Sequence, residues 1–383
     1  METTIVFDPI VSGHHLEYLR HIWTVCSQKP SRHFVFLVSP EFVSRKDQLG
    51  IKEIDNIHIQ ELSISEAKRC TNPSIICRAL SISFVVNRYV KLFSASKVFS
   101  ISIIDFLPFF PLISLRGVKV SGIVYGIYLY GWKSSSLLKK LGNILKYTLF
   151  SRSRVFEHVF ILNDAASARR LNYLYKTDRF SGLPDPFLPV IPLPGLCIRS
   201  LYDIPNDKTL FVHFGSLGER KGTMRILDSL LLLDAEEAKK YAFVFAGKVP
   251  DSLSKKFYET VAQIKEQNHL QIHIEDCFCD YSYIASICDQ CDSILIPYLD
   301  TSRSSGLIGY SSQFGKPVIA PSSGLIGKLV FRYKLGLLLN DISSLQLINS
   351  YKEIRSNNYT KPTNDYCQSH TIQLFSSAIS RVI

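Results

Sequence analysis

The chain has 383 residues, of which 46% are hydrophobic and 20% charged, a composition that excludes a disordered or low-complexity protein. Its length is too great for one ordinary core, and we expect two similar domains. The formal net charge of +11 indicates a partner such as nucleic acid, anionic lipid or a phosphorylated metabolite.

The first half alternates short β-rich runs with segments of helical period, which is typical of a parallel sheet with crossover helices. We expect strands at 4–8, 33–39, 57–62, 98–104, 118–125 and 158–163. The clearest helices are expected at 14–27, 73–93, 134–150 and 164–176.

Prolines then cluster in residues 180–205, where fixed φ angles and missing N–H donors disfavour regular ladders, so this stretch is predicted to be a linker. A second alternation follows. Its strands are expected at 209–215, 241–246, 270–274, 293–298, 317–320 and 335–339, with helices such as 221–234 and 251–267 between them.

The predicted fold class is α/β, with two Rossmann-like, doubly wound parallel-sheet domains that face each other across a cleft. Ligands of such domains bind at the carboxyl ends of the strands. We expect domains at 1–198 and 199–360, and a C-terminal helix within 361–383 that crosses back to the first domain.

The sequence opens directly on a strand-like run and contains no long apolar segment, so we expect a cytoplasmic protein without a signal peptide or membrane span. Its nine cysteines are expected to be reduced thiols. Cys277, Cys279, Cys288 and Cys291 lie close together in the sequence, but their spacing is not a usual zinc pattern. Buried thiols are the preferred interpretation, and no metal is expected.

A phosphate-binding turn is predicted where the strand at 209–215 meets the next helix. Gly215 and Gly218 permit a tight loop, the helix start presents N–H groups and a positive dipole end, and Lys221 adds a cation suited to phosphate. The alternative is a plain tight turn with a solvated lysine.

A second helix entrance of the same kind follows at Ser304, Ser305 and Gly306. The serines can cap the helix, and the glycine lets a ligand approach the backbone closely. Two such entrances in one sheet suit a diphosphate, whereas the alternative is helix capping alone.

Four motifs, "FGSLGERKG", "FVFAGKV", "CDSILIPY" and "SSGLIGYSSQFGKPVIAPSSGLIGKLV", resemble in order and spacing the nucleotide-binding half of GT-B glycosyltransferases of the large retaining group called family 4. The resemblance is strong over residues 210–339. In the first half it is weaker and depends on "DPIVSGHHLEYLRHI" and "LPDP".

This resemblance implies that the second domain holds a nucleotide-sugar donor, that the first holds the acceptor, and that the sugar is transferred with retention and without a metal or other cofactor. Lys221 falls on the family's diphosphate-binding lysine. The family usually has an arginine five residues before this lysine. Here Ser216 stands at that position, and Arg220 is a nearby residue that can substitute for the arginine. The family's two glutamates fall on Ser302 and Tyr310. The donor-binding residues are expected to be Gly13, Gly215, Ser216, Gly218, Arg220, Lys221, Phe278, Ser304, Ser305 and Gly306.

The catalytic candidates are Lys221, His14 and Asp105. His14 and His15 follow the first strand, where a histidine can accept a hydrogen bond from a sugar hydroxyl or act as a base. Asp105 ends a strand that faces the cleft. Helix capping is the alternative role for each of these first-domain residues.

No acidic residue occurs between Phe106 and Phe156, and the expected helix there carries leucines interleaved with Lys139, Lys140 and Lys146. A basic amphipathic helix can lie on an anionic bilayer, and an ordinary crossover helix has the same stripe. We expect a nucleotide-sugar donor, a growing surface polysaccharide or lipid-linked glycan as acceptor, peripheral contact with an anionic membrane at its inner face, and no nucleic acid. The alternatives are a sugar-nucleotide epimerase and a catalytically silent scaffold.

Overall fold

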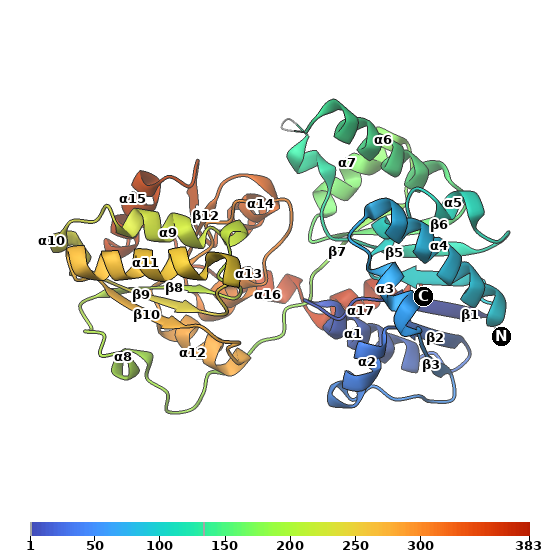
Figure 1. The fold of residues 1–383 in the computed structure, drawn as a ribbon, viewed down its shortest axis with the longest axis horizontal. Helices are drawn as coiled ribbons and strands as arrows, with labels where there is room; N and C mark the ends of the chain where they lie inside the picture. The colour runs from blue at the N-terminus through green and yellow to red at the C-terminus, as the bar shows by residue number, and fades with distance from the viewer. Residues whose placement is uncertain (1, 133–134) are drawn as a thin grey trace. The chain divides into compact units, whose positions relative to one another are not determined.

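The computed structural model describes residues 2–132 and 135–383. The chain forms two compact units, an N-terminal unit of Met1–Pro186 with Thr371–Ile383 and a C-terminal unit of Phe187–His370. Each unit is an α/β fold built on one parallel sheet (Figure 1). The predicted fold class, α/β with two doubly wound parallel-sheet domains, is confirmed.

The N-terminal sheet has seven parallel strands in the order β3-β2-β1-β4-β5-β6-β7. Its strands are β1 (Thr3–Asp8), β2 (His33–Val38), β3 (Ile57–Glu61), β4 (Lys97–Ser100), β5 (Lys119–Val124), β6 (Phe156–Leu162) and β7 (Phe180–Leu183). The order reverses between β1 and β4, and this is where a doubly wound sheet binds ligands.

Strand β7 lies in the stretch that the sequence predicts to be a linker, so the linker prediction is wrong at its start. Phe180 is buried, and the Asn172 side chain bonds both its backbone N–H, at 3.0 Å, and its carbonyl, at 2.8 Å. The first proline of the cluster, Pro184, follows the strand and therefore does not interrupt the ladder.

Alternate residues of each central strand enter different cores, as the period of two requires. Ile5 and Phe7 pack under one helical layer, whereas Val6 packs under the other. The first layer contains α3 (Ile64–Cys70), α4 (Ile75–Leu92), α5 (Phe110–Ile113), α6 (Leu137–Arg152) and α7 (Ala165–Tyr175). The second contains α1 (His15–Ser27), α2 (Pro40–Arg45) and α17 (Ile372–Ser380).

Helix α17 belongs to the N-terminal unit although it ends the chain (Figure 1). Its Phe375 is buried against the ring of Tyr18 in α1, with 5.3 Å between the ring centroids. Lys29 also donates to the carbonyl of Ile383 at 2.7 Å. The C-terminal segment therefore completes the core of the N-terminal unit.

The C-terminal sheet has six parallel strands in the order β10-β9-β8-β11-β12-β13, which reverses between β8 and β11. Its strands are β8 (Thr209–Phe214), β9 (Tyr241–Ala246), β10 (Gln271–Glu275), β11 (Ser293–Leu295), β12 (Val318–Pro321) and β13 (Gly336–Leu339). Its helices are α8 (Ile198–Leu201), α9 (Thr223–Leu230), α10 (Ala235–Ala238), α11 (Asp251–Asn268), α12 (Tyr281–Gln290), α13 (Leu307–Phe314), α14 (Gly324–Tyr333), α15 (Ser344–Arg355) and α16 (Asp365–Ser369).

The proline-rich stretch before residue 198, which the sequence analysis assigns to the first domain, bonds to the C-terminal unit. The amide of Val190 donates to Gln313 at 3.1 Å, and that of Leu193 donates to Ser286 at 2.8 Å. The backbone N–H groups of this extended stretch have no strand partner, and polar side chains of α12 and α13 accept their hydrogen bonds instead.

In the two described ranges, no helix combines the length and the apolarity that crossing a bilayer requires.

Candidate functional site

The loop after β8 is held by its own backbone hydrogen bonds. The amide of Gly215 donates to Ala246 at 2.9 Å, and that of Leu217 donates to Lys248 at the same distance. Gly215 has a φ of +92° and Gly222 one of +74°, in the region that favours glycine. The amides of Gly215 and Leu217 are therefore not available to a ligand. Fewer N–H groups can bind phosphate here than the sequence predicts.

Lys221 ends a short 3-10 turn (Glu219–Lys221) and folds back over this loop. A β-carbon on Gly215 would lie 2.4 Å from the Lys221 ammonium nitrogen. The same Nζ lies 3.5 Å from the carbonyl of Phe214, the last residue of β8. The absence of a side chain at Gly215 is thus what lets the cation lie against the end of the strand.

The buried side chain of His213 holds the loop after β8 in place through hydrogen bonds to two neighbouring elements. His213 donates from Nδ1 to the carbonyl of Leu295 in β11, and its Nε2 lies 3.0 Å from the hydroxyl of Thr223 in α9. Burial lowers the pKa of His213 to about 4, and the charge of Lys221 acts in the same direction. The ring is therefore neutral and ties β8, β11 and α9 together at the reversal of the strand order.

Tyr298 connects the two predicted helix entrances. It follows β11 and is 4% exposed. The Lys221 ammonium lies 5.6 Å from its ring centroid, and the Arg220 guanidinium carbon lies 5.8 Å from it. On its polar side, the Tyr298 hydroxyl accepts a hydrogen bond from Ser305 at 3.2 Å. The structure thus brings Arg220, Lys221 and Ser305 together around one tyrosine that the sequence analysis did not single out.

The start of α13 also uses several of its own donors. The amide of Leu307 donates to the Ser305 hydroxyl at 3.3 Å, and Ile308 donates to the Ser305 carbonyl at 3.2 Å. The amides of Ser216 and Gly306 have no acceptor among the described residues. Each entrance therefore keeps unsatisfied backbone donors, among them the amide of Ser216 at the first and that of Gly306 at the second.

The two positions where the resembled family has glutamates have different surroundings. Tyr310 is buried, and its ring packs against Phe214 at 5.3 Å and against Phe187 at 5.3 Å. Ser302 donates from its hydroxyl to Asp300 at 2.6 Å and from its amide at 3.0 Å. One position is thus part of the core, and the other orients a neighbouring carboxylate.

Asp300 is a candidate that the sequence analysis did not name. Partial burial acts to raise its pKa, but the hydrogen bonds from Ser302 and the charges of Arg303 and Arg220 hold the pKa below its ordinary value. The C-terminal site therefore has an ionised carboxylate close to its cations. The aspartate could have been found from its place directly after the "CDSILIPY" strand.

The hexapeptide Ser-Ser-Gly-Leu-Ile-Gly occurs twice, at residues 304–309 and 322–327, and each copy begins a helix. In the second copy, the amide of Leu325 donates to Thr301 at 2.7 Å. Gly324 has a φ of +71°, and a β-carbon there would lie 2.2 Å from the Thr301 hydroxyl. The second copy therefore anchors the loop that carries Asp300 and Ser302.

Phe278 does not join this group. It is 84% exposed in the loop after β10, an edge strand that is two strands away from β8. Its neighbours Cys277 and Cys279 have sulfurs 3.9 Å apart, and Cys277 is exposed. Cys288 and Cys291 are buried, and burial raises the pKa of Cys291 to about 12. The predicted buried thiols are thus found for two of these four cysteines.

In the N-terminal unit, the loop after β1 brings a histidine to a buried carboxylate. Asp8 is buried, and its carboxylate lies 2.7 Å from Nδ1 of His15. Burial raises the pKa of Asp8, although the bond and the charge of His15 oppose this shift. The predicted catalytic residue His14 is exposed, and its Nδ1 lies 3.6 Å from Glu17. Gly13 has a φ of +67° with open space around it, so it permits the turn.

Aromatic rings surround this pair. The ring of His15 stacks on Tyr125 at 5.5 Å, and Tyr125 stacks on Tyr18 at 6.1 Å. Tyr18 donates to Asp185, and the hydroxyl of Tyr125 has no partner among the described residues. His15, held by Asp8, and the Tyr125 hydroxyl are thus polar groups at the carboxyl ends of β1 and β5.

Asp105 is engaged in an internal network. Arg78 donates to it at 2.9 Å and Ser102 at 2.8 Å. Lys146 lies near both, and burial lowers its pKa. Asp105 lies in a 3-10 turn (Ile103–Phe106) beyond the end of β4, so the prediction that it ends a strand is wrong. Its carboxylate is paired with Arg78, and its charge acts to raise the pKa of Asp8.

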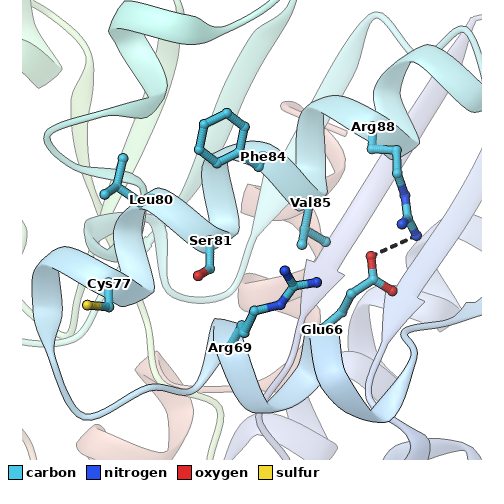
Figure 2. Close-up of a pocket in the computed structure, with 8 residues that line it drawn as sticks. All are labelled: Glu66, Arg69, Cys77, Leu80, Ser81, Phe84, Val85 and Arg88. Carbon is cyan, nitrogen blue, oxygen red and sulfur yellow. Dashed lines mark ion pairs between the residues drawn. The ribbon is translucent and has the colours of Figure 1, made fainter.

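A separate groove of about 400 Å³ lies between α3 and α4 (Figure 2). Arg69 and Arg88 line it, Phe84 and Leu80 project from α4, and Arg88 pairs with Glu66 at 2.7 Å. None of the predicted site residues lines it.

The chain matches no known family model and no curated protein sequence. Solved structures match it over its whole length. It resembles WaaG, a glycosyltransferase involved in lipopolysaccharide biosynthesis, with a TM-score of 0.67 and 13% identity over 100% of this chain and 99% of that one. It also resembles Anabaena HepE in complex with UDP, with a TM-score of 0.63 and 13% identity over 100% and 99% of the two chains.

A third similar structure is provisionally described as a UDP-N-acetylglucosamine 2-epimerase from Listeria monocytogenes, with a TM-score of 0.59 and 11% identity over 99% of this chain and 94% of that one. The expectation of a GT-B fold is therefore confirmed. Since these descriptions name different reactions for similar folds, the fold does not decide the reaction.

Proposed function

We propose that the protein is a retaining glycosyltransferase of the family 4 type, which moves a sugar from a nucleoside diphosphate donor onto a growing surface polysaccharide or a lipid-linked glycan. The observation that carries the proposal is the convergence of Arg220, Lys221 and Ser305 on Tyr298 at the carboxyl ends of β8 and β11. This is the point of a doubly wound sheet where nucleotides bind.

The chemistry of these groups suits a departing diphosphate. When the bond from the sugar to the diphosphate breaks, negative charge grows on the phosphate oxygens, and fixed cations and N–H donors stabilise it. Lys221 supplies a compact charge, Arg220 a second one, and the Ser216 and Gly306 amides supply two dipoles. We expect no metal ion or other cofactor, because these groups already provide the positive charge.

Asp300 serves in this proposal as the acceptor for a donor hydroxyl, the role that a family glutamate would have at the position of Ser302. Ser302 fixes one oxygen of Asp300 with two hydrogen bonds and leaves the second oxygen for a ribose or sugar hydroxyl. In this protein Asp300, held by Ser302, takes the place of the family's glutamate. This arrangement is compatible with activity on a different nucleotide-sugar donor.

The N-terminal unit holds the acceptor in this proposal. His15, which is oriented by Asp8, can accept a proton or a hydrogen bond from an acceptor hydroxyl. We place the reaction at the cytoplasmic face of a membrane, because the basic excess of the chain is concentrated between Phe106 and Phe156.

The first test is calorimetric titration of the purified chain with UDP, GDP, ADP and their sugars, followed by measurement of sugar-nucleotide consumption in the presence of glycan acceptors. The proposal expects one nucleoside diphosphate to bind in the micromolar range and its sugar to be consumed only with acceptor. If no nucleoside diphosphate binds, the proposal is overturned.

A catalytically silent binding protein is the second candidate. It is favoured by one observation: the second glutamate position is occupied by Tyr310, which is part of the core. Binding of a donor that is never consumed, with any acceptor, would favour this candidate over the transferase.

A further inference from the structure

Helix α6 packs on the sheet of the N-terminal unit over only its C-terminal half. Its buried residues are Tyr147, Phe150 and Ser151, and the rings of Tyr147 and Phe150 join the core formed with α4 and α7. A crossover helix normally buries its apolar stripe against the sheet. In α6 the apolar residues of the N-terminal half are not used in this way.

Five large apolar side chains of α6 are exposed instead, and we call them the α6 apolar face. They are Leu137 (77% exposed), Leu138 (83%), Leu141 (63%), Ile144 (40%) and Leu145 (53%). Their spacing of one, three and four residues places them on one side of a helix. A single exposed leucine needs no explanation, but a contiguous apolar stripe on one helix indicates an interaction surface.

The segment that carries this face has no unpaired acidic side chain. Residues 106–156 contain no acidic side chain, and in the preceding residues 67–105 the one acidic side chain, Asp105, is paired with Arg78 at 2.9 Å. Lys139 and Lys140 belong to α6 itself. Lys146 lies apart from this set, because it is half-buried near Asp105.

A tryptophan lies next to the α6 apolar face. Trp132 is 36% exposed, and the ammonium of Lys140 lies 5.4 Å from its ring centroid. Tryptophan and lysine together are typical of the interface between water and lipid, where the ring lies at the level of the headgroups and the ammonium meets phosphates.

The neighbouring helices of the same layer add to this pattern. Helices α4, α5 and α6 share one core under the same face of the sheet. Phe84 of α4 is 65% exposed, and Leu112 of α5 is 74% exposed. Figure 2 shows Phe84 and Leu80 projecting from α4 beside Arg69 and Arg88. Exposed apolar side chains thus recur across the layer, and on α4 they lie beside Arg69 and an Arg88 that is paired with Glu66.

We propose that the α6 apolar face docks on an anionic lipid bilayer, with α6 parallel to the membrane plane, its leucines among the acyl chains and Lys139, Lys140 and Trp132 at the headgroups. The membrane suits both features, because it presents apolar volume beneath a negatively charged surface. Nucleic acid would use the cations but not the leucines, and protein interfaces are depleted in lysine.

This inference rests on the proposed function for its purpose, because docking would bring the acceptor-binding unit to a lipid-linked acceptor. Its physical basis is independent of the C-terminal site. The two proposals can therefore fail separately.

The two tryptophans of the chain allow a direct test. Trp23 lies in α1 on the opposite layer and donates to the Lys52 carbonyl at 2.9 Å, so the variant Trp23→Phe leaves Trp132 as the single indole reporter. We expect a blue shift of its emission with phosphatidylcholine vesicles that contain phosphatidylglycerol, a much smaller shift with phosphatidylcholine alone, and quenching by brominated acyl chains.

The matched variants are Leu138→Asp/Leu141→Asp and, as control, Leu345→Asp in α15, whose side chain is 68% exposed. The double variant should bind anionic vesicles at least about tenfold more weakly, since each inserted leucine contributes on the order of a tenfold gain. The control should bind like the parent. Circular dichroism and UDP titration of each variant would separate lost docking from lost folding.

Equal vesicle binding by the double variant, or no blue shift on anionic vesicles, would overturn the proposal. Binding to a duplex oligonucleotide that competes fully with vesicles would overturn it in favour of a nucleic-acid surface. Vesicle binding by a protein that takes up no nucleoside diphosphate would support this inference while removing the proposed function.

Discussion

The ammonium nitrogen of Lys221 lies 5.6 Å from the centroid of the Tyr298 ring, and this relationship joins a turn after β8 to a segment after β11. The aromatic face holds the cation without neutralising it, because a ring offers a quadrupole and not a full charge. Lys221 therefore keeps most of its charge for an anionic ligand, which a carboxylate partner would prevent.

Replacing Lys221 with alanine is expected to lower turnover by roughly a hundredfold, the usual cost of removing one stabiliser of developing charge. The steady-state rate with a saturating donor is the measurement. Lys239→Ala is the matched control, because that lysine belongs to the same unit and pairs on the surface with Glu236 at 2.6 Å. An equal rate in the Lys221 variant and the parent would contradict the assignment of the phosphate site.

Substitutions of Tyr298 should separate its ring from its hydroxyl. Tyr298→Phe removes only the acceptor for Ser305, so donor affinity should fall by about threefold or less. Tyr298→Leu also removes the face under Lys221, and donor affinity should fall by roughly tenfold. Titration with the nucleoside diphosphate measures both. Equal affinities in the two variants would show that the ring does not position the cation.

Gly222 is expected to tolerate no side chain. Its φ of +74° and the carbonyl of Pro297, which would lie 1.9 Å from a β-carbon, predict that Gly222→Ala lowers the free energy of unfolding by roughly 2–4 kcal/mol. Gly142→Ala is the control. It lies within α6 with nothing within 4 Å of a β-carbon, and should be neutral or stabilising by about 0.5–1 kcal/mol. Thermal unfolding followed by circular dichroism compares the two.

The C-terminal unit should lose stability in mild acid through His213. Burial lowers the pKa of this histidine to about 4 in the folded state, from an ordinary value of 6.5. Between these values the unfolded chain binds a proton that the folded chain does not. The free energy of unfolding therefore falls as the pH drops below about 6.5, by about 2 kcal/mol at about pH 5.

Urea unfolding at about pH 6.5 and at about pH 5 measures this loss of stability. His213→Gln should reduce the pH dependence of the free energy of unfolding. The buried His370, whose pKa is also lowered to about 4 by burial, provides a second contribution, and some pH dependence should persist in the His213 variant. A slope that is the same in the His213 variant and the parent would contradict the prediction.

The strands of both sheets could be predicted from the sequence because most are short apolar runs between turn signals, and their alternation with helices indicates a parallel sheet. β7 was the exception. Its four residues adjoin a proline cluster, and only its pairing with β6 and the bonds from Asn172 establish it as a strand. Ladder partners distant in the sequence cannot be read from local composition.

Some residues of the candidate site could likewise be predicted from the sequence, and others could not. Lys221 and Ser305 could be predicted, because glycine turns and serines before helices have local signatures. Tyr298 could not, since its role depends on how close β8 and β11 lie in the sheet. The occupied amides of Gly215 and Leu217 likewise depend on β9, the neighbouring strand.

His15 should be more important for transfer than His14, because Nδ1 of His15 lies 2.7 Å from the buried carboxylate of Asp8, whereas the His14 side chain is exposed and lies 3.6 Å from Glu17. His15→Gln is expected to lower turnover by about tenfold to a hundredfold while donor affinity, a property of the other unit, stays within about twofold. His14→Gln is the matched control and should be active. Asp8→Asn should resemble His15→Gln and should alter the pH profile of the rate, a change that lost packing alone would not produce. If His14→Gln were the slower variant, Asp8 would be a structural residue and the sequence prediction for His14 would stand.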